Sequence, residues 1–253
     1  MRFDGIIIGG GPAGMLASII AAQQGAKVLL FERNDRLGKK LLITGKGRCN
    51  VTNACSAQEV LQNIPRNSRF LYSAMENYPP SGIMEFLESH GCKLKVERGN
   101  RVFPVTDKSS SVLECLRNVM HRSGVQIRNE RVQEILRDEN GVTGVKIGRE
   151  VVKANWVILA TGGVSYPTTG STGDGYEMAR KLGHTIIEPE GSLVPLECAG
   201  SDCQDMQGLS LRNVGVKLLN AKNKVLYKDF GELLFTHFGI SGPTVLSSSA
   251  HLK

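Results

Sequence analysis

A short glycine-rich loop between an apolar run and a helical run constrains the fold of this chain more than any other feature. Phe3 to Ile8 is apolar, and it leads into the pattern GxGxxG, with glycines at Gly9, Gly11 and Gly14. Residues 15–24 are small and apolar, which is typical of a helix, and a second apolar run from Lys27 to Phe31 ends at Glu32. This order of strand, loop, helix, strand and acid predicts a βαβ unit that binds a dinucleotide.

Each position of the pattern has a physical task. Gly9 permits the tight turn, Gly11 lets the backbone approach a pyrophosphate, and Gly14 lets helix and strand pack closely. Pro12 and Ala13 lie within the loop, and the helix that follows offers free N–H groups and a positive dipole end to the phosphates. Glu32 lies 18 residues beyond Gly14, where its carboxylate can accept hydrogen bonds from ribose hydroxyls and disfavours a 2′-phosphate. The alternative is a βαβ unit whose glycines serve turn geometry alone.

A basic segment follows directly. Residues 33–50 carry six basic side chains, at Arg33, Arg36, Lys39, Lys40, Lys46 and Arg48, against the single acid Asp35. Gly45 and Gly47 allow close approach of the backbone to a ligand. Thr44-Gly45-Lys46 resembles part of a P-loop, but Lys40 stands where the first glycine of that motif is required. The alternative is a solvated basic surface loop, which would be the preferred interpretation without the preceding glycine fingerprint.

Residues 38–53, which read GKKLLITGKGRCNVTN, resemble the signature of the HI0933-like flavoproteins, also called the aminoacetone-oxidase or dehydro-bile-acid-reductase type. The resemblance continues through residues 160–163, 170–176, 192–196 and 231–243. It implies an FAD-dependent oxidoreductase that acts on a small organic or steroid-like substrate. The cofactor-binding residues predicted from the glycine loop and from this resemblance are Gly9, Gly11, Pro12, Ala13, Gly14, Glu32, Arg33, Lys40, Leu41, Thr44, Gly45, Gly47, Arg48, Cys49, Asn50, Val132, Ala160, Thr161, Gly162, Gly163 and Gly173.

The expected fold is α/β: a Rossmann-like FAD-binding domain with a parallel sheet and a β-meander over residues 1–190, carrying a helical insertion near 54–105. Residues 191–253 are expected to begin a β-rich, inserted substrate-side domain that is truncated relative to the family. Helices are expected at 69–78, 80–90, 176–182 and 239–251, hairpins at 93–105 and 214–227, and meander strands at 131–137, 142–147 and 150–153. A separate buried strand is expected at 155–160.

One further helix is expected to open with a capping box, Ser111 to Glu114. Its apolar stripe comprises Val112, Leu113, Leu116, Val119 and Met120. The glycine-rich residues 170–175 precede another helix, and they predict either a ligand-binding loop near the flavin or a capping loop with Asp174 in the first turn.

The sequence assigns no catalytic residue and no metal site. It has no HExxH, no GxSxG and no closely spaced cysteine pair among its six cysteines. Cys49 could be a redox thiol, but no resolving cysteine lies within three residues, and it is interpreted as a small residue in a tight cofactor loop. His184 and His237 could be acid–base groups, but a lone histidine is more often structural, and both are interpreted in that way. The redox chemistry would therefore be that of the flavin.

Expectations about partners follow from charge and motif count. Only one dinucleotide fingerprint occurs, so electrons are expected from the substrate or from a transiently docked NAD(P)H. A net charge of +7 leaves a regulatory nucleic-acid-binding protein as an alternative, but aromatic residues make up only 6% of the chain and no basic stripe contains them, so no nucleic acid is expected. An NAD-dependent dehydrogenase is a second alternative, against which residues 38–53 argue. Because the sequence shows no signal peptide and no 18-residue apolar run, the chain is expected to be cytoplasmic and without a membrane partner. Nothing in the sequence indicates the oligomeric state.

Overall fold

The computed structural model describes residues 2–252, which form two compact units. Unit 1 contains the chain up to Leu61 and Arg69–Ile187, and unit 2 contains Gln62–Ser68 and the chain from Glu188 on. Each unit is described by itself. The assignment of residues 191–253 to a substrate-side domain stays a prediction.

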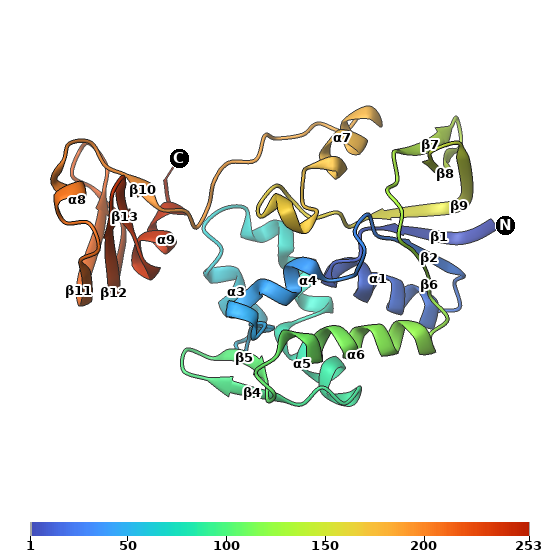
Figure 1. The fold of residues 1–253 in the computed structure, drawn as a ribbon, viewed down its shortest axis with the longest axis horizontal. Helices are drawn as coiled ribbons and strands as arrows, with labels where there is room; N and C mark the ends of the chain where they lie inside the picture. The colour runs from blue at the N-terminus through green and yellow to red at the C-terminus, as the bar shows by residue number, and fades with distance from the viewer. Residues whose placement is uncertain (1, 253) are drawn as a thin grey trace. The chain divides into compact units, whose positions relative to one another are not determined.

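A six-stranded sheet in the order β6-β2-β1-β9-β8-β7 is the centre of unit 1 (Figure 1). Four strands run parallel: β1 (Arg2–Ile8), β2 (Val28–Phe31), β6 (Gln126–Arg128) and β9 (Glu150–Leu159). The strands β8 (Gly141–Ile147) and β7 (Glu134–Asp138) extend it in antiparallel fashion. The predicted Rossmann-like parallel sheet with a meander is thereby confirmed.

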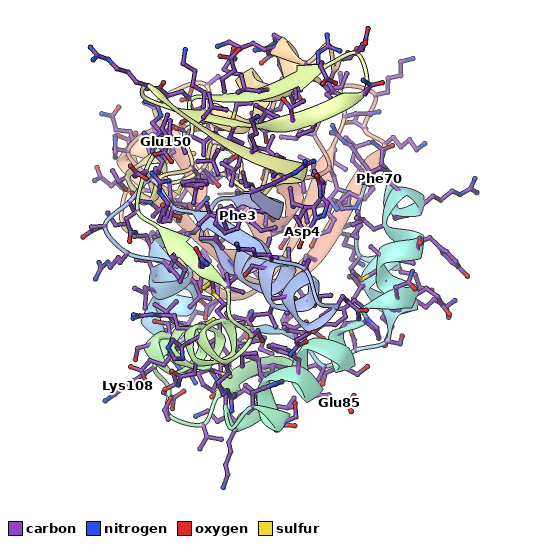
Figure 2. All side chains as sticks on the ribbon, turned by 90° about the vertical axis from the view of Figure 1, so that its right-hand side faces the viewer. Phe3, Asp4, Phe70, Glu85, Lys108 and Glu150 are labelled. Carbon is purple, nitrogen blue, oxygen red and sulfur yellow. The ribbon has the colours of Figure 1, made fainter. Side chains whose placement is uncertain are left out.

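Apolar side chains cover both faces of this sheet, because successive residues of a strand point to opposite sides. Ile7 and Leu30 join a core cluster with α1 (Pro12–Gln23) and α6 (Ser109–Arg122). Ile6 and Leu29 join a second cluster with the meander strands. Burial on both faces explains why β1 and β2 are continuous apolar runs rather than alternating ones. Figure 2 shows Phe3 in the interior of unit 1, where it is 4% exposed, whereas Phe70 at the periphery is 86% exposed.

The strand expected at 150–153 and the buried strand expected at 155–160 are one strand, β9. Its first part pairs with β8 through Val151 and Val152, and its second part pairs with β1 through Val157 and Ile158. No turn residue separates the two parts, and Ala154 between them is buried, so the chain passes from the meander into the parallel sheet without a break. Its second part is only partly buried.

The predicted apolar stripe of α6 is confirmed, since all five of its side chains are buried. The capping box is wrong. The helix begins at Ser109, with Lys108 extended at the cap position and no side-chain cap hydrogen bond. Ser111 therefore lies inside the first turn, and its hydroxyl pairs with that of Thr106 at 2.7 Å.

The insertion contains short helices and a small sheet. The helices are α3 (Ala57–Gln62), α4 (Tyr72–Asn77) and α5 (Pro80–Ser89), and a short 3-10 helix, η2 (Ser68–Leu71), replaces the start of the helix expected at 69–78. The expected hairpin consists of β4 (Leu94–Glu97) and β5 (Arg101–Pro104). A third strand, β3 (Thr52–Asn53), pairs with β5 on the side away from β4. This third strand joins the basic segment to the insertion.

Two short α-helices and two 3-10 helices complete the described part of unit 1. After the glycine loop and β2 come α2 (Lys39–Ile43) and the 3-10 helix η1 (Thr44–Gly47). After β9 come the 3-10 helix η3 (Pro167–Thr169) and α7 (Asp174–Lys181). The last of these begins two residues before the predicted start at Tyr176.

Unit 2 is built on a four-stranded antiparallel sheet in the order β10-β13-β12-β11. The expected hairpin is longer than predicted and consists of β11 (Ser210–Leu219) and β12 (Val225–Thr236). The other elements are β10 (Leu196–Glu197), α8 (Asp202–Asp205), β13 (Gly239–Ser241) and α9 (Pro243–Ser249). The helix expected over 239–251 is therefore wrong in its first part, because residues 239–241 pair with β10 and β12 and Pro243 opens the helix. Within residues 2–252, no helix has both the length and the apolar character needed to cross a membrane.

Candidate functional site

A cavity of about 300 Å³ lies at the carboxyl ends of β1, β2 and β9. In open α/β sheets, ligands bind in the crevice outside the carboxyl ends of the strands. Three loops supply most of its wall: the glycine loop after β1, residues 32–34 after β2, and residues 160–162 after β9. Residues 38–40, residues 130–132, residues 169–171, Asp174 and Met178 also line the cavity.

The three glycines of the fingerprint differ in what surrounds them. A Cβ atom on Gly9, whose φ is 114°, would lie 2.4 Å from the carbonyl oxygen of Ala160. A Cβ atom on Gly14 would lie 1.9 Å from the carbonyl oxygen of Gly9, so the packing of α1 on the loop requires glycine there. On Gly11 a Cβ atom would meet no protein atom within 4 Å. Gly11 therefore borders open space in the cavity, at the amino end of α1, where no side chain caps the helix. This cradle fits a pyrophosphate.

Glu32 is buried at the tip of β2, with 6% of its surface exposed. Its Oε2 accepts a hydrogen bond from the amide of Gly10 at 2.7 Å. Its Oε1 accepts from the amide of Asn34 at 2.8 Å and from the Asn34 side chain at 2.6 Å. These bonds hold the carboxylate in one orientation beside the cavity. A carboxylate oxygen can accept more than one hydrogen bond, so Oε2 retains capacity for a ribose hydroxyl.

About half of the predicted cofactor residues line this cavity: Gly9, Gly11, Pro12, Ala13, Glu32, Arg33, Lys40, Val132, Ala160, Thr161 and Gly162. Gly14 lies beneath the loop, and Gly163 and Gly173 are sequence neighbours of lining residues. Leu41 is in the apolar core. The others, Thr44, Gly45, Gly47, Arg48, Cys49 and Asn50, lie outside the lining, and their roles toward the cofactor stay predictions.

The segment 44–50 folds back on itself. Gly45 and Lys46 are both left-handed, and a Cβ atom on Gly45 would lie 2.8 Å from the amide nitrogen of Asn50. Cys49 is buried in the core, and this burial raises the pKa of its thiol, against a smaller lowering by the hydrogen bond with Thr44. The structure therefore agrees with the interpretation of Cys49 as a small residue in a tight turn.

Arg48 pairs with two carboxylates, Glu97 and Asp107, and its guanidinium lies over the ring of Phe103, 4.1 Å from the centroid. Lys95 also pairs with Asp107, at 2.6 Å. The positive charge of Arg48 is thereby balanced by two carboxylates that do not line the cavity. In this arrangement Arg48 holds the basic segment against the small sheet.

Sequence reasoning placed Arg33 in the cofactor site but missed Arg131 and Asp174, which come from distant parts of the chain and also line the cavity. Asp174 accepts hydrogen bonds from Arg33 and Arg131 at 3.0 Å each and from Thr172 at 2.6 Å. Burial raises the pKa of Asp174, but the bond from Thr172 and the charges of Arg33 and Arg131 together lower it below its ordinary value. The glycine-rich loop 170–175 was the available signal, and Asp174 was interpreted from it only as a first-turn residue.

Two further hydrogen bonds tie the loop after β9 to the segment after β2. Lys40 Nζ donates to the carbonyl of Ser165 at 2.8 Å. The side chain of Asn34 donates to the carbonyl of Thr169 at 3.2 Å. His184 and His237 do not line the cavity, and among residues 2–252 no three side chains cluster as metal ligands.

Comparison with known proteins identifies the family. Residues 3–242 match the family described as HI0933-like protein Rossmann domain. The chain belongs to this family. It is 31% identical over 252 residues to the ribosomal RNA dihydrouridine synthase of Escherichia coli, covering 99% of this chain and 61% of that protein. It is 33% identical over 249 residues to the 3-dehydro-bile acid delta(4,6)-reductase of Clostridium scindens, covering 97% and 59%.

The fold is shared with the open conformation of a flavocytochrome c3 fumarate reductase, with a TM-score of 0.61 and 21% identity over 87% of this chain and 48% of that chain. The chain spans about three fifths of the length of the two curated relatives, the dihydrouridine synthase and the bile acid reductase. FAD, the predicted cofactor, is the cofactor of the HI0933-like family. The residues present fit its ADP half, because an open glycine cradle and an oriented carboxylate border one cavity.

Proposed function

We propose that this chain is the FAD-binding part of a flavin-dependent reductase that saturates a carbon–carbon double bond conjugated to a carbonyl group. The observation that carries the proposal is the cradle at Gly11 beside the anchored carboxylate of Glu32, in a chain of the HI0933-like family. When bound, the flavin supplies the hydride chemistry that the protein's own side chains lack. The chain's residues bind and orient the adenosine and pyrophosphate groups.

The names of the relatives support this substrate class. A dihydrouridine synthase and a delta(4,6)-reductase of a 3-dehydro-bile acid are both named for adding hydrogen across a double bond. In uracil and in a 3-oxo-4,6-diene, that double bond is conjugated to a carbonyl. We therefore propose a small organic or steroid-like ene-carbonyl as the substrate, with NAD(P)H docking transiently as the source of the hydride and solvent as the source of the proton.

The test begins with the protein purified anaerobically. Heat-released cofactor is identified by mass, and reduction of the bound flavin by NADH and by NADPH is followed by loss of its visible absorbance. The reduced protein is then mixed with a 3-oxo-4,6-dienoic bile acid, and recovery of the oxidised spectrum together with a hydrogenated product supports the proposal. Release of a nicotinamide instead of a flavin would contradict it.

A polynucleotide substrate is the second candidate, because the chain is similar over nearly its whole length to a ribosomal RNA dihydrouridine synthase and carries a net charge of +7. A uridine-containing RNA is the probe. Reoxidation of the flavin by RNA but not by the bile acid, with binding that weakens steeply as salt increases, would favour it.

A further inference from the structure

Two arginines that line the cofactor cavity share one aspartate. Arg33 directly follows Glu32 at the end of β2, and Arg131 lies between β6 and β7. Asp174, the first residue of α7, also lines the cavity. The three side chains come from separate parts of the sequence and meet in the lining of one cavity.

The contacts of Asp174 use both of its oxygens. Oδ2 accepts hydrogen bonds from Nη1 of Arg33 and from Nε of Arg131, each at 3.0 Å, and Nη2 of Arg131 lies 2.9 Å from the same oxygen. Oδ1 accepts from the hydroxyl of Thr172 at 2.6 Å, and that hydroxyl accepts from Arg33 at 2.7 Å. The Asp174 side chain is 16% exposed, against 61% for Arg131. The carboxylate is thus the least exposed member of the cluster and holds both guanidinium groups.

An arginine in this place has a known chemical use. Dinucleotide sites that accept a 2′-phosphate place an arginine near the end of the second strand, where an acid would otherwise bind the 2′-hydroxyl. The planar guanidinium binds phosphate oxygens through paired N–H groups. Here the acid, Glu32, is present, and Arg33 and Arg131 donate to Asp174 instead.

We propose that Asp174 is a specificity-determining residue, which makes the cavity select an adenosine dinucleotide with a free 2′-hydroxyl by keeping Arg33 and Arg131 occupied. The inference rests on the nucleotide site of the proposed function. It adds that the selection depends on Asp174, at the start of α7, as well as on Glu32. With Asp174 neutralised, the same cavity would present two arginines to a 2′-phosphate.

The experiment uses apoprotein from which FAD has been removed, refilled with FAD, and followed by flavin fluorescence. Two competitors are titrated, adenosine 5′-monophosphate and adenosine 2′,5′-bisphosphate, which differ only in the 2′-phosphate. The variant is Asp174→Asn, which keeps the side-chain shape. The matched control is Asp107→Asn, which removes the same charge from a carboxylate that holds Arg48 and Lys95 outside the cavity lining.

We expect Asp174→Asn to raise the preference for the bisphosphate by about tenfold or more, the factor expected for a charge-assisted hydrogen bond. Asp107→Asn should leave the preference unchanged, and the double variant Asp174→Asn with Arg33→Gln should lose most of the gain. Circular dichroism of each variant checks that it folds.

Three results would overturn the inference. The first is an unchanged preference in Asp174→Asn, and the second is an equal rise in Asp107→Asn, which would make net charge the cause. The third is loss of both competitors in a folded Asp174→Asn, which would mean that the aspartate only maintains the cavity. A wild-type protein that binds neither FAD nor the monophosphate would refute the nucleotide site itself.

Discussion

Gly11→Ala and Gly14→Ala, three residues apart in one loop, should act on different properties: the first should weaken cofactor binding, and the second should lower stability. A methyl group on Gly14 would lie 1.9 Å from the backbone oxygen of Gly9, which cannot rotate away. Such overpacking costs about 3 kcal/mol, and the better helix propensity of alanine returns about 1 kcal/mol. Gly14→Ala should therefore lower the free energy of unfolding by about 2 kcal/mol.

Gly11→Ala should leave that free energy nearly unchanged. Gly11 has φ −75° and ψ 177°, which alanine adopts readily, and its Cβ atom would meet no protein atom within 4 Å. Reduced entropy of the unfolded chain stabilises by about 0.5 kcal/mol, and alanine at a helix cap costs a similar amount. The methyl group would, however, stand where the pyrophosphate approaches. Loss of one charge-assisted hydrogen bond weakens FAD binding by about tenfold to a hundredfold.

The assay separates the two effects. Urea unfolding of FAD-free protein, followed by circular dichroism, gives the free energy of unfolding, and quenching of flavin fluorescence gives the affinity for FAD. Gly215→Ala in β11 is the matched control, because its Cβ atom also meets no atom within 4 Å. The reasoning is refuted if Gly11→Ala binds FAD as wild type does, or if it destabilises the protein as much as Gly14→Ala.

Three other predictions concern the core, acid stability and the thiols. Met120→Ala, at a fully buried position of α6, should lower the free energy of unfolding in urea by about 2–5 kcal/mol. Arg117→Ala, on the exposed face of the same helix, should change it little, and equal effects would contradict the assignment of the buried face. Hydrogen bonds from Lys95 and Arg48 hold the pKa of Asp107 below its ordinary value of 3.8. The contribution of this carboxylate to folding stability is therefore present above that value and is lost as the pH falls through the lowered pKa. The melting temperature should stay constant down to about pH 5 and fall below about pH 4, and the fall should be less steep in Asp107→Asn. Burial raises the pKa of Cys92 to about 11, with smaller contributions from Cys115 and Cys49. A thiol reagent at neutral pH should therefore label Cys92 only after the protein unfolds. Labelling of Cys92 as fast as that of the less buried Cys55 would show that the core around Cys92 opens in the folded protein.

Local patterns in the sequence were sufficient wherever one short segment carries the physical constraint. The glycine fingerprint predicted which glycine the turn requires and which one faces open space, and the structure shows this difference at Gly9, Gly14 and Gly11. The stripe of α6 was readable because five apolar side chains at helical spacing leave one buried face. At the start of α6 the local motif was misleading, because the structure has Lys108 at the cap position, three residues before the serine that the motif favoured.

Only the tertiary structure decided how distant segments combine. Residues 239–241 are strand because β10 and β12 lie on either side of them, and Arg48 points to Glu97 and Asp107 because β3 brings the basic segment beside the small sheet. The cluster of Arg33, Arg131 and Asp174 joins residues up to 141 positions apart. Hydrogen bonds of that range leave no periodicity in the sequence, since they depend on where the parallel strands end in space. The sequence by itself therefore determined the dinucleotide fold and its cofactor, and the packing of three loops at one sheet edge decided which side chains surround the cavity.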